Sequence, residues 1–223
     1  MRQDREPGFA TPGHTRRQAL RLVLAAPLSA LAACQVPVPG QGPPPNLFRL
    51  TPKSTFGENL PTVDWQLVLE TPLANAGIDT TRIALQRGPM RIEYYARAQW
   101  SDRAPFMVQT LMIESFENSG RIVAVGRDTV GLRADFILQT ELREFQVEYF
   151  NGSTPKAHVA IAARMVKMPR RAIIGSATFE EVAPAGADKL DAIIPAFDAA
   201  LGKVLRRLVE WTLVTGQAAR RTA

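Results

Sequence analysis

The chain has 223 residues and a formal net charge of +6, with one cysteine and two histidines. Residues 1–33 carry five arginines against one aspartate and one glutamate, which leaves +3 for residues 34–223. An excess this small does not favour nucleic-acid binding. A lone cysteine excludes an internal disulfide, so we expect one domain of ordinary size that is held together by its core.

Residues 15–34 are typical of a secretory leader. Arg16 and Arg17 begin it, and an apolar run over residues 22–33 follows. This run is too short for a membrane span, which needs roughly 20 apolar residues. The small residues before the only cysteine resemble a bacterial lipobox: Leu31, Ala32, Ala33 and Cys34. We therefore predict a signal peptide over residues 1–33, exported by either the general or the twin-arginine route.

Cleavage at the lipobox would make Cys34 the first residue of the mature protein. Its thiol would carry the acyl chains, and this covalent lipid is the only cofactor that we expect. The alternative is that the match arose by chance and Cys34 is an ordinary buried thiol. Gln35 follows the cysteine, and by the sorting rule of enteric bacteria it favours the outer membrane, with the inner membrane as the alternative.

The segment after the cysteine is rich in proline and glycine. It reads QVPVPGQGPPPN over residues 35–46, and such a sequence extends as a semi-rigid spacer of about 3.1 Å per residue. We therefore interpret residues 34–46 as the lipidated cysteine and its tether. The folded domain is predicted over residues 47–216, with a disordered tail over residues 217–223.

The first half of the domain shows both strand and helix patterns. We expect strands at residues 47–50 and 63–70, and a hairpin of residues 81–86 and 90–95 around Gly88. A helix is predicted over residues 105–118, because a proline opens the segment and Ser119-Gly120 ends it. A short strand at residues 121–125 follows.

The second half predicts an antiparallel meander and a long helix. In the strand over residues 134–150 the apolar residues change phase, which requires a bulge between Leu142 and Phe145. Strands over residues 157–166 and 171–179 follow, and apolar spacings of three and four predict a helix over residues 188–214. The fold class is α+β: one domain with a mixed, mostly antiparallel sheet and two packed helices, of which the C-terminal one is long.

Few residues of the chain are suited to catalysis or metal binding. His158 is the only histidine after the leader, so no His-Cys metal cluster and no Cys-His pair can form within one chain. We expect no catalytic residue and no metal ligand. A hydrolase that uses His158 as its base is the less favoured alternative.

The first predicted helix has apolar residues on more sides than one sheet would cover. Clustered aromatic residues precede it in the sequence. We predict an interaction surface here, for a partner protein or for a second copy of the chain, while core packing is the alternative. Its candidate residues are Tyr94, Tyr95, Trp100, Met112 and Phe116.

Short motifs in a fixed order carry a family resemblance that spans nearly all of residues 34–223. They are Asp79-Thr80, Arg82-Ile83-Ala84-Leu85, Tyr94-Tyr95, Ala98-Gln99-Trp100, Ser119-Gly120-Arg121, Val125-Gly126, Ala134-Asp135, Glu141-Leu142, Ala199-Ala200-Leu201 and Val209-Glu210-Trp211. In this pattern the chain resembles the ABC-type transport auxiliary lipoprotein family. It departs from the family at residues 101–105, which keep only part of a proline-rich turn.

The resemblance implies a non-enzymatic accessory of an ABC transporter whose substrate-binding component carries mammalian-cell-entry (MCE) domains. Such systems move lipids between the inner and outer membranes of Gram-negative bacteria. The expected partners are the membrane, through the lipid anchor, and the MCE protein. A structural or assembly lipoprotein of the envelope, unrelated to transport, is the alternative.

Overall fold

A computed structural model describes residues 44–128, 133–150 and 154–221. The residues from Pro44 onward form one structural unit. The predicted signal peptide, Cys34 and most of the predicted tether lie outside the described residues.

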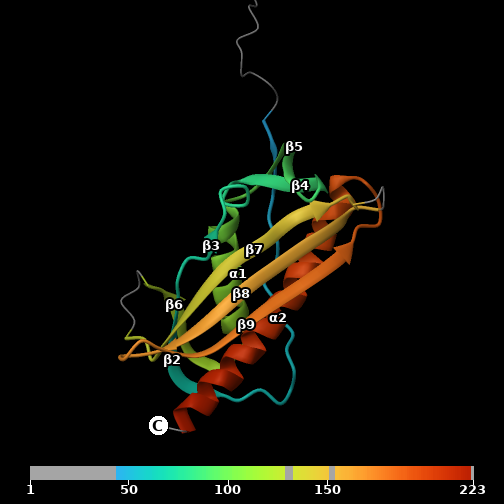
Figure 1. The fold of residues 1–223 in the computed structure, drawn as a ribbon. Helices are drawn as coiled ribbons and strands as arrows, with labels where there is room; N and C mark the ends of the chain where they lie inside the picture. Colours follow the sequence, from blue (N-terminus) through green and yellow to red (C-terminus); the bar gives the residue numbers. More distant parts are fainter. Residues whose placement is uncertain (1–43, 129–132, 151–153, 222–223) are drawn as a thin grey trace, which may run out of the picture. The chain divides into compact units, whose positions relative to one another are not determined.

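Strand β7, Phe136–Glu148, is the centre of the sheet (Figure 1). Along one edge it pairs over its whole length with antiparallel β8, Lys156–Lys167, and β9, Ala172–Pro184, lies beyond β8. Three shorter parallel strands occupy the other edge of β7 one after another. They are β2, Val63–Leu69, β3, Leu73–Ala74, and β4, Arg82–Gly88.

The remaining strands extend this sheet. β5, Arg91–Trp100, forms an antiparallel hairpin with β4, and β1, Asn46–Phe48, pairs with β5 in parallel. β6, Ile122–Arg127, pairs in parallel with β2. The sheet is therefore mixed and its longest pairings are antiparallel, which confirms the predicted α+β class.

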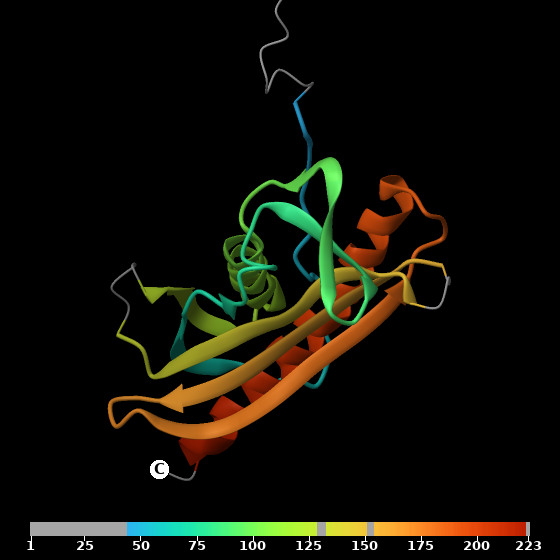
Figure 2. The ribbon, with the colours of Figure 1, turned by 45° about the horizontal axis from the view of Figure 1, so that its top comes forward.

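Helices α1, Ala104–Ser119, and α2, Leu190–Arg221, lie behind the sheet in the view of Figure 1. Figure 2 shows α2 running along β8 and β9 on that side, and the opposite face of these strands carries no helix. Pro105 lies in the first turn of α1, and Gly120 ends the helix with a φ of 60°. Among the described residues, neither helix combines the length and the apolar character that crossing a membrane requires.

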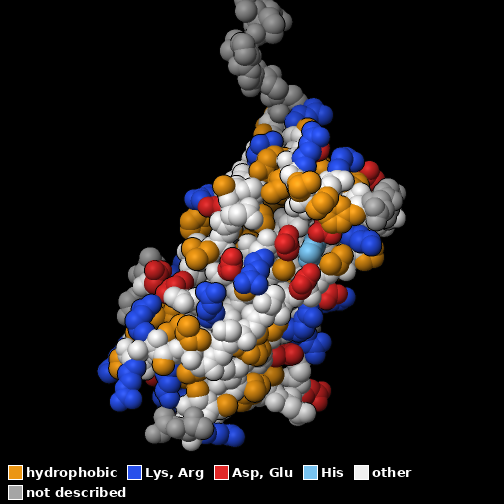
Figure 3. Space-filling model, viewed as in Figure 1, with side chains coloured by type: hydrophobic (Ala, Val, Ile, Leu, Met, Phe, Trp, Pro, Cys, Tyr) orange, Lys and Arg blue, Asp and Glu red, His pale blue; other side chains and the backbone are white. Residues whose placement is uncertain are grey.

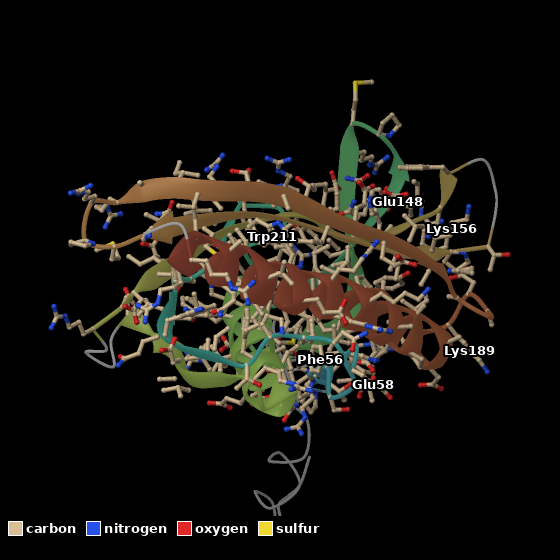
Figure 4. The ribbon with its side chains drawn as sticks, turned by 90° about the horizontal axis from the view of Figure 1, so that it is seen from below. Phe56, Glu58, Glu148, Lys156, Lys189 and Trp211 are labelled. Atoms are coloured by element: carbon tan, nitrogen blue, oxygen red, sulfur yellow. The ribbon has the colours of Figure 1, made fainter. Side chains whose placement is uncertain are left out.

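Aromatic rings fill the space between the sheet and the helices. Trp100, Phe145 and Phe197 pack together with ring centroids 5.1–5.4 Å apart. Trp211 of α2 lies toward β9, where its ring packs on Phe179 at 5.8 Å (Figure 4). Burial of each large aromatic side chain contributes about 1.5–3 kcal/mol, so these rings add to the stability that the aliphatic core supplies.

The predicted bulge in β7 is confirmed. The register between β7 and β8 shifts between Leu142 and Glu144, so Leu142 and Phe145 both face the helices. Without the extra residue, one of the two side chains would point away from the core.

The predicted tail is wrong for residues 217–221, because α2 continues to Arg221. Gly216 does not end the helix, and its missing side chain instead lets α2 approach Trp65 closely. Lys167 Nζ donates a 2.9 Å hydrogen bond to the carbonyl oxygen of Ala219, and Arg220 lies 3.5 Å from the carboxylates of Asp64 and Asp135. These contacts hold the last turns of α2 on the sheet. Residues 222–223 lie outside the described part of the chain.

Candidate functional site

Three residues of the predicted interaction surface lie in the core. Trp100 is 1% exposed, and Met112 and Phe116 are 0% exposed. The sheet alone would not cover α1, but α2 and the residues around Lys53 also pack on it, and Lys53 N donates a 2.9 Å hydrogen bond to Ser115 Oγ. The apolar breadth of α1 therefore reflects three neighbours within the chain, and the prediction is corrected at these three residues.

The two tyrosines of that prediction are half-buried and fix the β4–β5 hairpin to the domain. The hydroxyl of Tyr95 lies 2.6 Å from that of Tyr149, which donates a 2.5 Å hydrogen bond to Asp188 just before α2. Burial, and then the contact with Tyr149, raises the pKa of Tyr95, while burial and the bond to Asp188 raise the pKa of Tyr149. The guanidinium of Arg82 stacks 3.7 Å from the ring centroid of Tyr94.

The exposed part of this region is the tip of the β4–β5 hairpin, the turn around Met90. Met90 is 97% exposed at the turn, and Ile92 is 40% exposed beside it. Arg87 and Arg91 flank them and both pair with Glu93, at 3.8 and 3.2 Å. The sequence did contain a signal for the turn itself, since Gly88-Pro89 is a typical turn pair.

The face of β7–β9 that carries no helix is rich in acidic residues, and Figure 3 shows carboxylates around His158, the one histidine among the described residues. His158 Nδ1 lies 2.5 Å from Glu148 Oε1, and Nε2 lies 2.8 Å from Glu180 Oε1. Glu144 lies beside them and bonds to Gln146 at 2.5 Å. Burial lowers the pKa of His158, but the two carboxylate contacts outweigh burial and raise the pKa above its ordinary value.

Two adjoining hollows lie further along the same face. The first has a volume of about 150 Å³ and lies where the pairing of β7 passes from β2 to β3. The second, of about 330 Å³, lies over β8 and β9. Ala162 and Arg164 line both. Because the side chains of Ala162 and Ser176 are small, the surface is recessed at this part of the face.

The sequence profile of the ABC-type transport auxiliary lipoprotein component family matches residues 48–209. The chain belongs to this family. The match covers every described helix and strand except β1, whose first two residues precede it, and the end of α2. The members of this family are auxiliary lipoprotein components of ABC-type transport.

Relatives of this auxiliary lipoprotein share its fold. The crystal structure of protein XCC0632 from Xanthomonas campestris has a TM-score of 0.76 and 31% identity, and the match covers 79% of this chain and 99% of that one. A second solved structure, of an uncharacterized protein, has a TM-score of 0.54 at 12% identity and covers 81% and 99% of the two chains, so it shares the fold alone.

A curated relative is an uncharacterized protein of Bradyrhizobium diazoefficiens, 27% identical over 173 residues. The match covers 75% of this chain but spans 44% of the length of that relative.

The geometry of this auxiliary lipoprotein does not favour the hydrolase alternative. Both ring nitrogens of His158 contact carboxylates, so the ring is not paired with a serine or threonine hydroxyl that it could activate. Within residues 44–128, 133–150 and 154–221, no group of three or more His, Cys, Asp or Glu side chains is placed to hold a metal ion. The described surface presents an exposed hairpin tip and a charged sheet face.

Proposed function

We propose that this lipoprotein is a non-enzymatic accessory of an MCE-type ABC system that moves lipids between the inner and outer membranes. A lipid on Cys34 anchors it, most simply to the outer membrane, and the domain faces the periplasm. The family match over residues 48–209 is the observation that carries the proposal. The lipobox at residues 31–34 and the proline-rich segment after it support the anchor.

Capture of the partner tests this function. The full chain with an affinity tag, purified from detergent-solubilised envelopes, should recover the MCE protein of the transporter. A matched control is a lipid-anchored protein of unrelated fold with the same tag, which should not recover it. Recovery of outer-membrane assembly factors alone would instead support the structural alternative.

We also propose that copies of the domain associate head to tail, with the hairpin tip of one copy on the acidic sheet face of the next. The tip presents Met90 and two arginines, and the sheet face presents Glu144, Glu148 and Glu180. Opposite charges on two different surfaces of one chain favour a heterologous contact, which forms a closed ring when the rotation between copies allows it. A lipid anchor would concentrate the copies on one membrane surface and so favour this contact.

A further inference from the structure

Strand β1, at the beginning of the described chain, has an outer face that carries an exposed leucine. Leu47 is 65% exposed. It pairs with Gln99 of β5, and Gln99 pairs with the exposed Arg82 of β4. Paired residues share one face of a sheet, so these three side chains form a row. Phe48, the next residue of β1, belongs to the other face and packs on the core.

An irregularity in β5 adds Arg97 to this end of the sheet. Two steps along β4 match five steps along β5, so β5 bulges within residues 94–99. Arg97 lies in the bulge with a φ of 55°, which is uncommon for a residue other than glycine. It is exposed, and the next residue, Ala98, pairs with Asn46 at the start of β1. The bulge therefore presents Arg97 beside the first residues of the described chain.

The two arginines of this region carry positive charge that the fold does not neutralise. Among the residues that the structure describes, Arg97 makes no hydrogen bond or ion pair through its guanidinium, and Arg82 makes a stacking contact but no ion pair. Arg49 shares a hollow with the carboxylate of Asp102, so we leave it out of the surface. Figure 3 shows basic and hydrophobic side chains together at this end of the molecule. The β1 surface consists of Leu47, Arg82 and Arg97.

The chain before β1 limits how far this surface can lie from the anchor of the proposed function. Ten peptide units join Cys34 to Pro44, where the described residues begin. An extended chain spans at most about 3.6 Å per residue, so this segment reaches about 35 Å at most. A lipid on Cys34 would therefore make contact between the β1 surface and the bilayer an intramolecular event. Tethering of this kind raises the effective concentration, so a weak contact is enough.

We propose that the β1 surface rests on the bilayer that holds the anchor, with its arginines on anionic phospholipid head groups and Leu47 at the boundary of the acyl chains. Each basic residue close to an anionic surface strengthens binding roughly fivefold. An exposed leucine adds apolar burial at the same depth. The proposal rests on the lipid anchor of the proposed function.

This contact would set the orientation of the domain. Figure 1 shows β2, β6 and the end of α2 at the opposite end of the domain from β1. These elements would then point away from the membrane, toward the periplasm.

Fluorescence of the full lipid-anchored chain in vesicles tests the docking. The vesicles contain phosphatidylcholine alone or an equal mixture with phosphatidylglycerol. Since the lipid occupies the thiol of Cys34, Ala96→Cys supplies the only free thiol, on an exposed residue beside Arg97, for a polarity-sensitive dye. We expect a blue shift of the emission with phosphatidylglycerol, a smaller shift without it, and a reduced shift at high salt.

The control places the same dye at the opposite end of the sheet. Val123→Cys in β6 should give no shift, because Val123 is 72% exposed and β6 lies away from β1. No shift at Ala96→Cys, an equal shift in both kinds of vesicle, or an equal shift at both dye positions overturns the proposal.

Variants of the dye-labelled chain locate the contact. Arg97→Gln should lower the ratio of docked to free domain about fivefold, and Arg97→Lys should keep it. Leu47→Ser should also lower the ratio. Arg170→Gln, in the exposed turn between β8 and β9, is the charge-matched control and should dock normally. A ratio that neither Arg97→Gln nor Leu47→Ser changes would refute this surface.

Failure of the docking and failure of the proposed function give different results. A chain without acyl groups would refute the anchor and the docking together. An acylated chain whose dye does not respond would refute the docking alone. Failure to capture the MCE protein would refute the proposed partner and leave the docking in place.

Discussion

Gly216 of α2 lies directly against Trp65 of β2. A Cβ atom at residue 216 would stand 2.5 Å from Trp65 Cζ2 and 2.6 Å from Met165 Cε. Both neighbours are 0% exposed, so neither side chain can move into solvent. The glycine therefore sets how closely the last third of α2 approaches the sheet.

Gly216→Ala should destabilise the domain. Alanine would gain about 1 kcal/mol in helix propensity, but overpacking against two buried side chains costs about 1–3 kcal/mol. Gly202→Ala is the matched control, because a Cβ there would meet only Lys53 Cδ, at 4.0 Å. Thermal unfolding should show a lower melting temperature for Gly216→Ala and a higher one for Gly202→Ala. A rise in both would mean that the contact with Trp65 relaxes freely.

Local sequence patterns predicted the helices and strands of this fold. They did not predict which side chains are buried, because burial depends on packing between segments that are far apart in the chain. The bulge in β7 followed from the phase of Leu142 and Phe145, because strand periodicity is a property of the segment itself. The burial of Met112 did not follow, because it depends on α2, which lies some 80 residues later in the chain. The number of apolar residues on α1 indicates that the helix is covered. It does not indicate whether the cover is another segment of the chain or a partner protein.

The hollows were beyond sequence reasoning for the same reason. Their parts come together only through the β7–β8 register, which pairs Gln139 with Arg164. The carboxylates around His158 likewise come from two other strands, β7 and β9, so the sequence showed a histidine in the polar phase of a strand but not its partners.

His158 should make stability depend on pH. Its pKa is raised in the folded state and lies near 6.5 in the unfolded chain, so folding favours the protonated ring. That contribution is fully present below about pH 6.5 and is lost as the pH rises through the folded pKa. The melting temperature of His158→Gln should therefore fall short of the parent by more at about pH 5.5 than at about pH 9. A deficit that stays constant over this range would contradict the assignment.

Cys34→Ser should abolish acylation. Cys34 is the only thiol of the chain, so no other residue can carry a thioether-linked lipid. Metabolic labelling with palmitate should mark the parent protein and leave the variant unlabelled, and density-gradient fractionation should place the parent in the outer membrane. Label that persists in the variant would refute the lipid anchor, and a parent in the inner-membrane fractions would correct the sorting.

Met112→Glu should unfold the domain. A carboxylate at this fully buried position has no cation within the apolar core around it, and burying an unpaired charge costs several kcal/mol. Phe116→Glu should behave in the same way. Circular dichroism should show loss of the folded signal in both, and a folded variant of either kind would mean that α1 can expose this side.

Met90→Glu should separate self-association from folding. Met90 is 97% exposed, so a charge there should leave the melting temperature unchanged. The same charge would repel Glu144, Glu148 and Glu180 of a neighbouring copy in the head-to-tail contact. Light scattering at high protein concentration should therefore show a mass above the monomer for the parent and a smaller mass for the variant.

Val123→Glu is the matched control for this experiment. Val123 is a 72% exposed side chain of β6, outside the hairpin and outside the acidic face, so the variant should keep the mass of the parent. Salt should weaken the association of the parent, because the contact joins arginines to carboxylates. A monomeric parent would disprove self-association, and equal masses for the parent and Met90→Glu would remove the hairpin tip from the interface.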